Sequence, residues 1–145
     1  MSESFLGKVA EAEMTMELYS VALVAAFTGV IWIPVILNRL VDMGVWSALK
    51  NPQPDTHPKA AWAFRLQNAH RNAIENLVVF APLAIVIDLA DLGSELTAVA
   101  CAVFVIARIL HAVIYAFGIP LLRTLAFAAG FVCQCLLALR IFGLV

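Results

Sequence analysis

A short run of charged and amide side chains leads directly into an uncharged apolar segment of this chain. Residues 65–76 read R-L-Q-N-A-H-R-N-A-I-E-N. At helical spacing, Asn68, Asn72 and Glu75 fall on one stripe, and Arg71 lies one turn before Glu75. A charged side chain near the bilayer centre costs roughly 2.5–3.5 kcal/mol. A polar stripe at the mouth of a membrane bundle therefore indicates a pocket for a charged, water-soluble ligand.

A second polar group follows near the end of a later apolar segment. Arg108, His111 and Tyr115 recur at i, i+3 and i+7, which places them on one helical face. Arg123 and Thr124 come shortly afterwards. Guanidinium, phenol and hydroxyl groups favour anion binding and the stabilisation of thiolates or enolates. The sequence has no Ser-His-Asp pattern, no Gly-rich phosphate loop and no close pair of carboxylates.

Several of these residues also have purely structural interpretations. Arg71 and Glu75 could form an ion pair within one helix, or could clamp a zwitterionic ligand. Asn68 and Asn72 could simply join helices by hydrogen bonds. Arg108 is too deep to reach water easily, so we expect it to contact Glu75 from a neighbouring span. No histidine pair has the spacing of metal ligands, and we expect no metal site.

Composition places the chain in a lipid bilayer. Of the 145 residues, 63% are hydrophobic and only 13% are charged, whereas soluble domains carry about 25% charged residues. The net charge of −1 gives no electrostatic reason to expect nucleic acid as a partner. The length fits one domain covering residues 1–145.

The elements that must position the polar residues are four transmembrane helices, so the predicted fold class is an all-α, four-helix membrane bundle. An uncharged run of about 20 residues is long enough to cross the hydrocarbon core. Pro34 is expected to kink the first span near its end. The predicted spans cover residues 18–40, 60–89, 95–118 and 121–144. A polar connection over residues 41–58 joins the first two, and the acidic start at 1–17 is expected to be a short exposed tail that could be helical in part.

The distribution of basic residues predicts the orientation in the membrane. The first connection is bracketed by Arg39, Lys50, Lys59 and Arg65, whereas the opposite side is mainly acidic. The positive-inside rule then places this connection in the cytoplasm and both termini on the non-cytoplasmic side.

Three motifs together resemble the MAPEG family, the membrane-associated proteins in eicosanoid and glutathione metabolism. They are R-x-x-x-A-H-R-N-x-x-E-N in the second span, R-x-x-H-x-x-x-Y in the third, and P-x-x-R-T at the start of the fourth. The family includes microsomal glutathione transferases and prostaglandin E synthase. The resemblance covers nearly the whole chain, and the short length and plain loops are similar to the bacterial branch.

The resemblance implies a homotrimer in the bacterial inner membrane, with glutathione bound between neighbouring protomers near the cytoplasmic face. It implies that Arg123 stabilises the glutathione thiolate and that Thr124 is a neighbouring hydroxyl donor. Asn68 stands where several characterised relatives carry an arginine. The glutathione-binding candidates are Arg39, Asn68, Arg71, Asn72, Glu75, Arg108, His111 and Tyr115.

The chemistry of glutathione is compatible with these residues. Arginines suit its two carboxylates through bidentate contacts, and Glu75 suits its ammonium group. A thiol is mostly protonated at pH 7, so a guanidinium beside it would supply the nucleophile. A lipophilic electrophile could reach the thiolate from the bilayer.

Three functions remain open on this reading. The first is a glutathione-dependent transferase or peroxidase that acts on lipophilic electrophiles. The second is a non-catalytic binding or scaffold protein that retains the polar pocket. The third is a small transporter or proton relay that uses Glu75, Arg108 and His111.

Overall fold

The computed structural model describes residues 14–53 and 56–145, and every regular element within these ranges is an α-helix. Four continuous or once-broken helical segments are long and apolar enough to cross a membrane, namely Met16–Met43, Ala61–Leu89, Glu95–Phe117 and Pro120–Ile141. The all-α prediction with four such segments is therefore confirmed for the described residues. The helices are α2 (Met16–Val30), α3 (Ile33–Met43), α4 (Val45–Leu49), α5 (Ala61–Leu89), α6 (Glu95–Phe117) and α7 (Pro120–Ile141).

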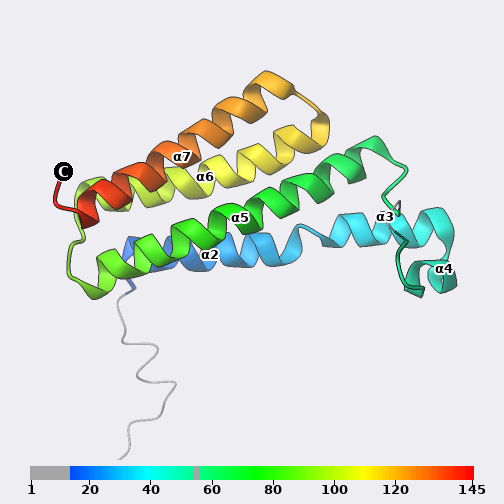
Figure 1. Cartoon of the computed structure of the whole chain (residues 1–145), viewed down its shortest axis with the longest axis horizontal. Helices are drawn as coiled ribbons and strands as arrows, with labels where there is room; N and C mark the ends of the chain where they lie inside the picture. The colour runs from blue at the N-terminus through cyan, green and yellow to red at the C-terminus, as the bar shows by residue number, and fades with distance from the viewer. Residues whose placement is uncertain (1–13, 54–55) are drawn as a thin grey trace, which may run out of the picture.

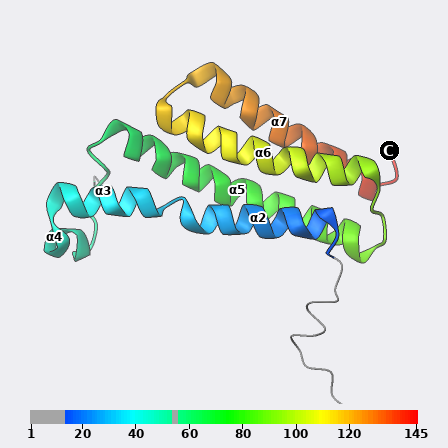
Figure 2. The same cartoon turned by 180° about the vertical axis from the view of Figure 1, so that it is seen from behind.

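The bundle has two distinct ends (Figures 1 and 2). At one end, α5 begins and α6 turns into α7 at Gly118; we call this the site end. At the other, α2 begins, α5 leads into α6, and the chain finishes at Val145; we call this the far end. Helix α6 packs most extensively against α7, and α5 contacts α2, α6 and α7.

The first span is broken rather than merely kinked. Helix α2 ends at Val30 and α3 begins at Ile33. Pro34 lacks the N–H that would bond the Val30 carbonyl in a continuous helix. The Trp32 indole N–H donates to the Gly29 carbonyl at 2.7 Å and so satisfies one group freed by the break. Beyond it, α3 packs against α4 and α5 and extends past the other helices (Figure 1).

Two expectations for the ends and connections need correction. The polar connection contains the short helix α4, because the apolar run Val45–Leu49 can form one turn before the prolines stop it. The acidic start is only partly testable, since residues 1–13 lie outside the described residues. Glu17, expected in an exposed tail, instead lies in the first turn of α2 and is 4% exposed.

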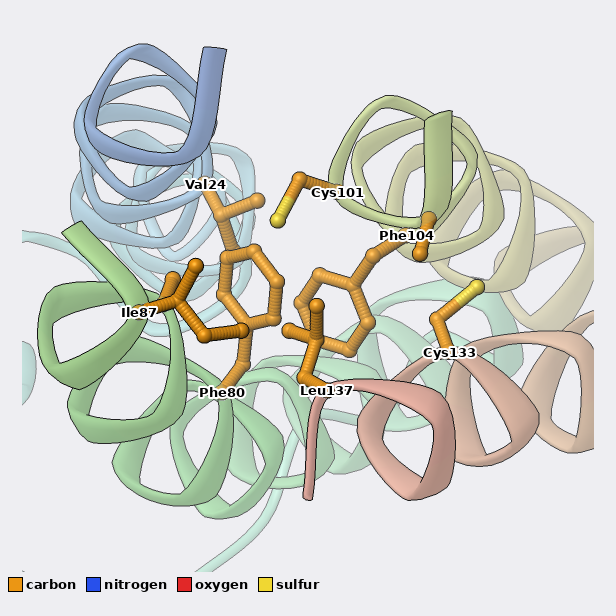
Figure 3. Packing of buried hydrophobic residues seen from close by; sticks show 9 residues of the cluster. Val24, Phe80, Ile87, Cys101, Phe104, Cys133 and Leu137 are labelled. Carbon is orange, nitrogen blue, oxygen red and sulfur yellow. The ribbon is translucent and has the colours of Figure 1, made fainter. Parts of the chain in front are cut away.

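The core between α2, α5, α6 and α7 is built around two stacked aromatic rings. Phe80 and Phe104 lie with ring centroids 3.9 Å apart and planes 10° from parallel (Figure 3). Cys101 and Cys133 are free thiols that pack beside these rings, in agreement with the apolar segments they occupy. This buried core fixes α6 relative to α5 and α7 in the half of the bundle nearer the far end.

The turn between α6 and α7 is held against the start of α5 by Arg65. Gly118 ends α6 with φ of 78°, a left-handed conformation that favours glycine. Arg65 Nε donates to the Ala116 carbonyl at 2.9 Å, and an added Cβ at Gly118 would lie 3.1 Å from the guanidinium carbon. This close approach sets where the first turn of α7, which carries Arg123, lies relative to α5.

Candidate functional site

A cavity of about 270 Å³ opens at the site end, between α5, α6 and the first turns of α7. Its walls combine two amides, an imidazole, a phenol, a guanidinium and a hydroxyl, with one apolar ring. The lining residues are Asn68, Asn72, His111, Tyr115, Arg123, Thr124 and Phe127. Tertiary packing thus brings together polar residues from three helices, six of which are candidates from the sequence.

Arg123 is the cation of this cavity. Its guanidinium carbon lies 4.3 Å from the centroid of the Tyr115 ring, a cation–π contact between α7 and α6. The side chain is half-buried and forms no hydrogen bond or ion pair with a residue of the described ranges. Stacking on an aromatic face leaves the N–H edge of a guanidinium free to bind an anion.

Thr124 lies beside Arg123 at the exposed rim of the cavity. Its hydroxyl donates to the Pro120 carbonyl at 3.0 Å, the backward contact that threonine often makes within a helix. The hydroxyl must therefore rotate about χ1 or its C–O bond before it can donate to a ligand in the cavity.

Arg108 lies behind the cavity wall and does not line the cavity. It is 1% exposed, and its guanidinium donates to Asn72 Oδ1 at 3.3 Å and to the Ala126 and Phe127 carbonyls at 3.2 and 3.4 Å. The expected contact with Glu75 is wrong, because amide and backbone oxygens supply the acceptors instead. Through Asn72, Arg108 orients one wall of the cavity.

Gly130 provides the space for this buried guanidinium. An added Cβ at position 130 would lie 2.6 Å from Arg108 Nη2. The rings of Phe104 and Phe127 lie 5.5 and 5.6 Å from the guanidinium carbon. Sequence reasoning missed Gly130; a glycine within an otherwise apolar helix is the signal that could have indicated such a close approach.

A second amide pair continues the polar band into the core. Gln134 Nε2 donates to the Asn76 carbonyl at 3.0 Å, and Asn76 Nδ2 donates to the Asn72 carbonyl at 2.9 Å. Asn76 and Gln134 are each 7% exposed. The Gln134–Asn76 contact joins α7 to α5, whereas the Asn76–Asn72 contact lies within α5. The contact within α5 uses the backbone carbonyl of Asn72, so its side-chain oxygen remains available to accept from Arg108.

His111 completes the inner wall on α6. It is 5% exposed, and its ring centroid lies 5.6 Å from that of Tyr115 and 6.2 Å from that of Phe127. Arg108, His111 and Tyr115 therefore lie along α6 in order from the buried guanidinium to the open cavity, on the shared face that their spacing predicts. Within the described residues, no cluster of three or more His, Cys, Asp or Glu side chains could hold a metal ion.

Arg71 and Glu75 lie outside the cavity. Both are exposed on the outer face of α5, and neither has a hydrogen-bond or ion-pair partner within the described ranges. The polar band on α5 therefore runs around the helix, from buried Asn76 through half-buried Asn72 to these two exposed charges.

Arg39 lies in a different cleft, between α3 and the start of α5. Its Nε is buried and has no hydrogen-bond partner among residues 14–53 and 56–145. The candidates from the sequence therefore fall into three groups: the residues that line the Arg123 cavity, Arg108 behind its wall, and three charged residues elsewhere on the bundle. The three are Arg39, Arg71 and Glu75.

Comparison with known proteins gives one match. No curated protein and no solved structure matches the chain. The model of the MAPEG family matches residues 16–143, nearly the whole chain, and the protein therefore belongs to the MAPEG family.

Proposed function

We propose that this protein is an integral membrane, glutathione-dependent transferase or peroxidase that acts on lipophilic electrophiles. The observation that carries the proposal is the cavity at the site end. There an arginine without an anionic partner stands beside a hydroxyl, a phenol and two amides, next to the lipid-facing surface of the bundle. Membership of the MAPEG family supports a glutathione-related role for such a cavity.

Glutathione complements the groups that are present. Its thiolate suits Arg123, whose guanidinium is stacked on Tyr115 and has no anionic partner among the described residues. Its peptide groups suit the amides of Asn68 and Asn72 on the opposite wall. With Thr124 rotated toward the ligand, a guanidinium and a hydroxyl would both stabilise the thiolate, which is the attacking nucleophile.

In the proposed reaction the thiol proton leaves to water at the open rim, and the thiolate attacks the electrophile. With an alkylating substrate, a carbon–sulfur bond forms as the leaving group departs with the bonding electrons. The lipophilic substrate enters from the bilayer, since exposed apolar residues such as Leu125 surround the first turns of α7. The protein supplies position and electrostatic stabilisation.

A second copy of the chain completes the proposed site, and we propose a homotrimer. Arg71 and Glu75 lie ten and fourteen residues after the first residue of α5, or roughly 15 and 21 Å along its axis. Unpaired charges facing lipid at such depth are costly, at roughly 2.5–3.5 kcal/mol each near the centre. A neighbouring protomer would cover them, and glutathione bound at that boundary could pair its carboxylates with Arg71 and its ammonium group with Glu75.

Arg39 is proposed to reach glutathione across the same boundary. Within its own protomer it lies in the cleft between α3 and α5, apart from the Arg123 cavity. The basic residues of the connection between α3 and α5 support a cytoplasmic location for the site end, in a bacterial inner membrane.

The test is the ultraviolet absorbance of thiolate on adding glutathione to detergent-purified protein. We expect a saturable thiolate signal in the wild type, its loss in Arg123→Ala, and a reduced signal in Arg123→Lys, which keeps the charge but not the planar fork. Lys50→Ala removes an exposed basic residue of the connection and serves as the matched control.

Size-exclusion chromatography with light scattering should verify that each variant assembles as the wild type does. An unchanged thiolate signal in assembled Arg123→Ala would overturn the role of Arg123. Saturable glutathione binding without any thiolate signal in the wild type would support the alternative function, a non-catalytic binding or scaffold protein.

A further inference from the structure

A second cleft, of about 220 Å³, lies between α3 and the start of α5 and is closed by residues 56–59. One part of its wall is apolar, and the rest carries basic, amide and acidic groups. The lining residues used below are Trp32, Ile36, Arg39, Lys59, Gln67 and His70. None of them lines the Arg123 cavity, because α5 presents Gln67 and His70 to one side and Asn68 and Asn72 to the other.

The polar part of this cleft carries excess positive charge. Arg39 and Lys59 face one acidic residue, Asp42, and neither cation forms an ion pair within the described ranges. Arg39 Nε is buried without a hydrogen-bond partner in the described part of the chain. A buried donor without a partner costs about 1–3 kcal/mol. The cleft therefore suits an anionic group that can accept hydrogen bonds.

The apolar part opens toward lipid. Trp32 and Ile36 are 43% and 39% exposed, and both lie on α3 where it leaves the bundle. Exposed Trp46 and Trp62 lie at the same end of the molecule. Tryptophans gather at the membrane–water interface, so the cleft lies at the depth of lipid headgroups.

We propose that this cleft binds an anionic phospholipid of the bilayer. The phosphate occupies the pocket between Arg39, Lys59 and His70, and the acyl chains leave past Trp32 and Ile36. A volume of about 220 Å³ accommodates a headgroup, while the open apolar side lets the chains remain in the membrane. The site lies apart from the Arg123 cavity and stands whether or not that cavity is catalytic. It assigns Arg39 to the lipid phosphate in place of the proposed contact with glutathione.

The experiment uses Trp32 as an internal reporter. The full chain with Trp46→Phe and Trp62→Phe retains Trp32 alone and is reconstituted in bilayers of brominated phosphatidylglycerol or brominated phosphatidylcholine. We expect phosphatidylglycerol to quench Trp32 at a several-fold lower mole fraction. Lys59→Gln and His70→Gln should reduce this preference, and Lys50→Gln, an exposed lysine outside the cleft, should preserve it.

Three results would overturn the proposal. Equal quenching by the two lipids would exclude selection of an anionic headgroup. Equal loss of preference in Lys50→Gln and Lys59→Gln would indicate general surface charge. Displacement of phosphatidylglycerol by soluble glycerol phosphate would assign the cleft to a water-soluble phosphate. A second variant leaves the charges of the cleft unchanged. Ile36→Phe should narrow the apolar opening of the cleft toward lipid and so weaken the quenching of Trp32 by brominated phosphatidylglycerol.

Discussion

The polar side chains that join α2, α5 and α6 at the far end have partners within the protein, whereas several of those around the Arg123 cavity have none among the described residues. Ser20 is an exception at the far end, since its buried hydroxyl has no partner in the described ranges. At the far end, the Thr15 hydroxyl donates to Asp88 at 2.7 Å, and the Thr97 hydroxyl donates to buried Glu17 at 2.6 Å. At the site end, Arg123 and Asn68 form no hydrogen bond or ion pair with a described residue. Both ends are rich in polar groups, but at the far end these threonine and carboxylate groups form hydrogen bonds to one another, whereas Arg123 and Asn68 at the site end do not.

At the far end, side chains also satisfy backbone groups at the ends of the helices. Ser94 and Thr97 form a reciprocal capping box at the start of α6, and Arg140 Nε donates to the Leu92 carbonyl at 3.0 Å. Polar groups that satisfy one another stabilise and orient helices. Polar groups left open around a cavity keep their hydrogen-bonding capacity for a ligand. We infer that the far end is architectural and the site end is functional.

Between the ends, the contacts of Arg108 show that a residue near the site can still be structural. Arg108→Ala should give the largest effect, because it empties a buried volume and removes contacts to α5 and α7. The free energy of unfolding should fall by about 2–5 kcal/mol. Reversible unfolding in mixed micelles, followed by circular dichroism, measures this. Ile109→Ala, at an exposed neighbouring position, is the control, and an equal loss there would contradict the assignment.

Gly130→Ala should give the next largest effect. The new Cβ would lie 2.6 Å from Arg108 Nη2, and the guanidinium has little freedom to move between two rings and two carbonyls. We expect a loss of about 1–3 kcal/mol in the free energy of unfolding. Gly29→Ala is a matched control, since an added Cβ there meets nothing within 4 Å. Comparable losses in the two variants would show that the contact with Arg108 is not the cause.

Thr97→Val tests the far end directly. It preserves shape but removes the donor to Glu17, so a buried carboxylate loses its partner. The expected loss of stability is about 1–3 kcal/mol. The thiolate signal per folded protein should not change, and a clear reduction in that signal would undermine the division of roles between the two ends.

Thr124→Val is the same substitution at the site end and should give the smallest change in stability. Thr124 is exposed, and its only hydrogen bond in the described structure is to the Pro120 carbonyl. The free energy of unfolding should stay within about 0.5 kcal/mol of the wild type. The thiolate fraction of bound glutathione should fall roughly 2- to 10-fold, as expected for one lost hydrogen bond. The reverse pattern, lost stability with normal thiolate, would contradict the proposed role of the hydroxyl.

Much of the helical framework could be predicted because it depends on local properties. The uncharged runs predicted four spans, and the structure has helices in each of these regions. Pro34 predicted a disturbance in the first span, and the break falls at Ile31 and Trp32, where a missing N–H has its effect. Helix α4 was not expected, because its five residues are too few for a periodic pattern.

The candidate site was predictable only in part. Helical spacing placed Arg108, His111 and Tyr115 on one face, and the cavity contains the last two. The partner of Arg108 could not be read from charge complementarity, because backbone carbonyls and an amide oxygen can accept hydrogen bonds from a guanidinium in place of a carboxylate. Glu17 was assigned to a tail because its burial depends on Thr97, eighty positions away.

The sequence by itself determined the membrane location, the helical segments and the polar residue types, since hydropathy and helical periodicity act over a few neighbouring residues. Only the tertiary structure decided which polar groups pair and which face a cavity. A guanidinium such as that of Arg108 is enclosed where Gly130 lets α7 approach, whereas that of Arg123 stays open above Tyr115. Both arginines have the same chemistry, and long-range packing alone gives one a structural and the other a proposed functional role.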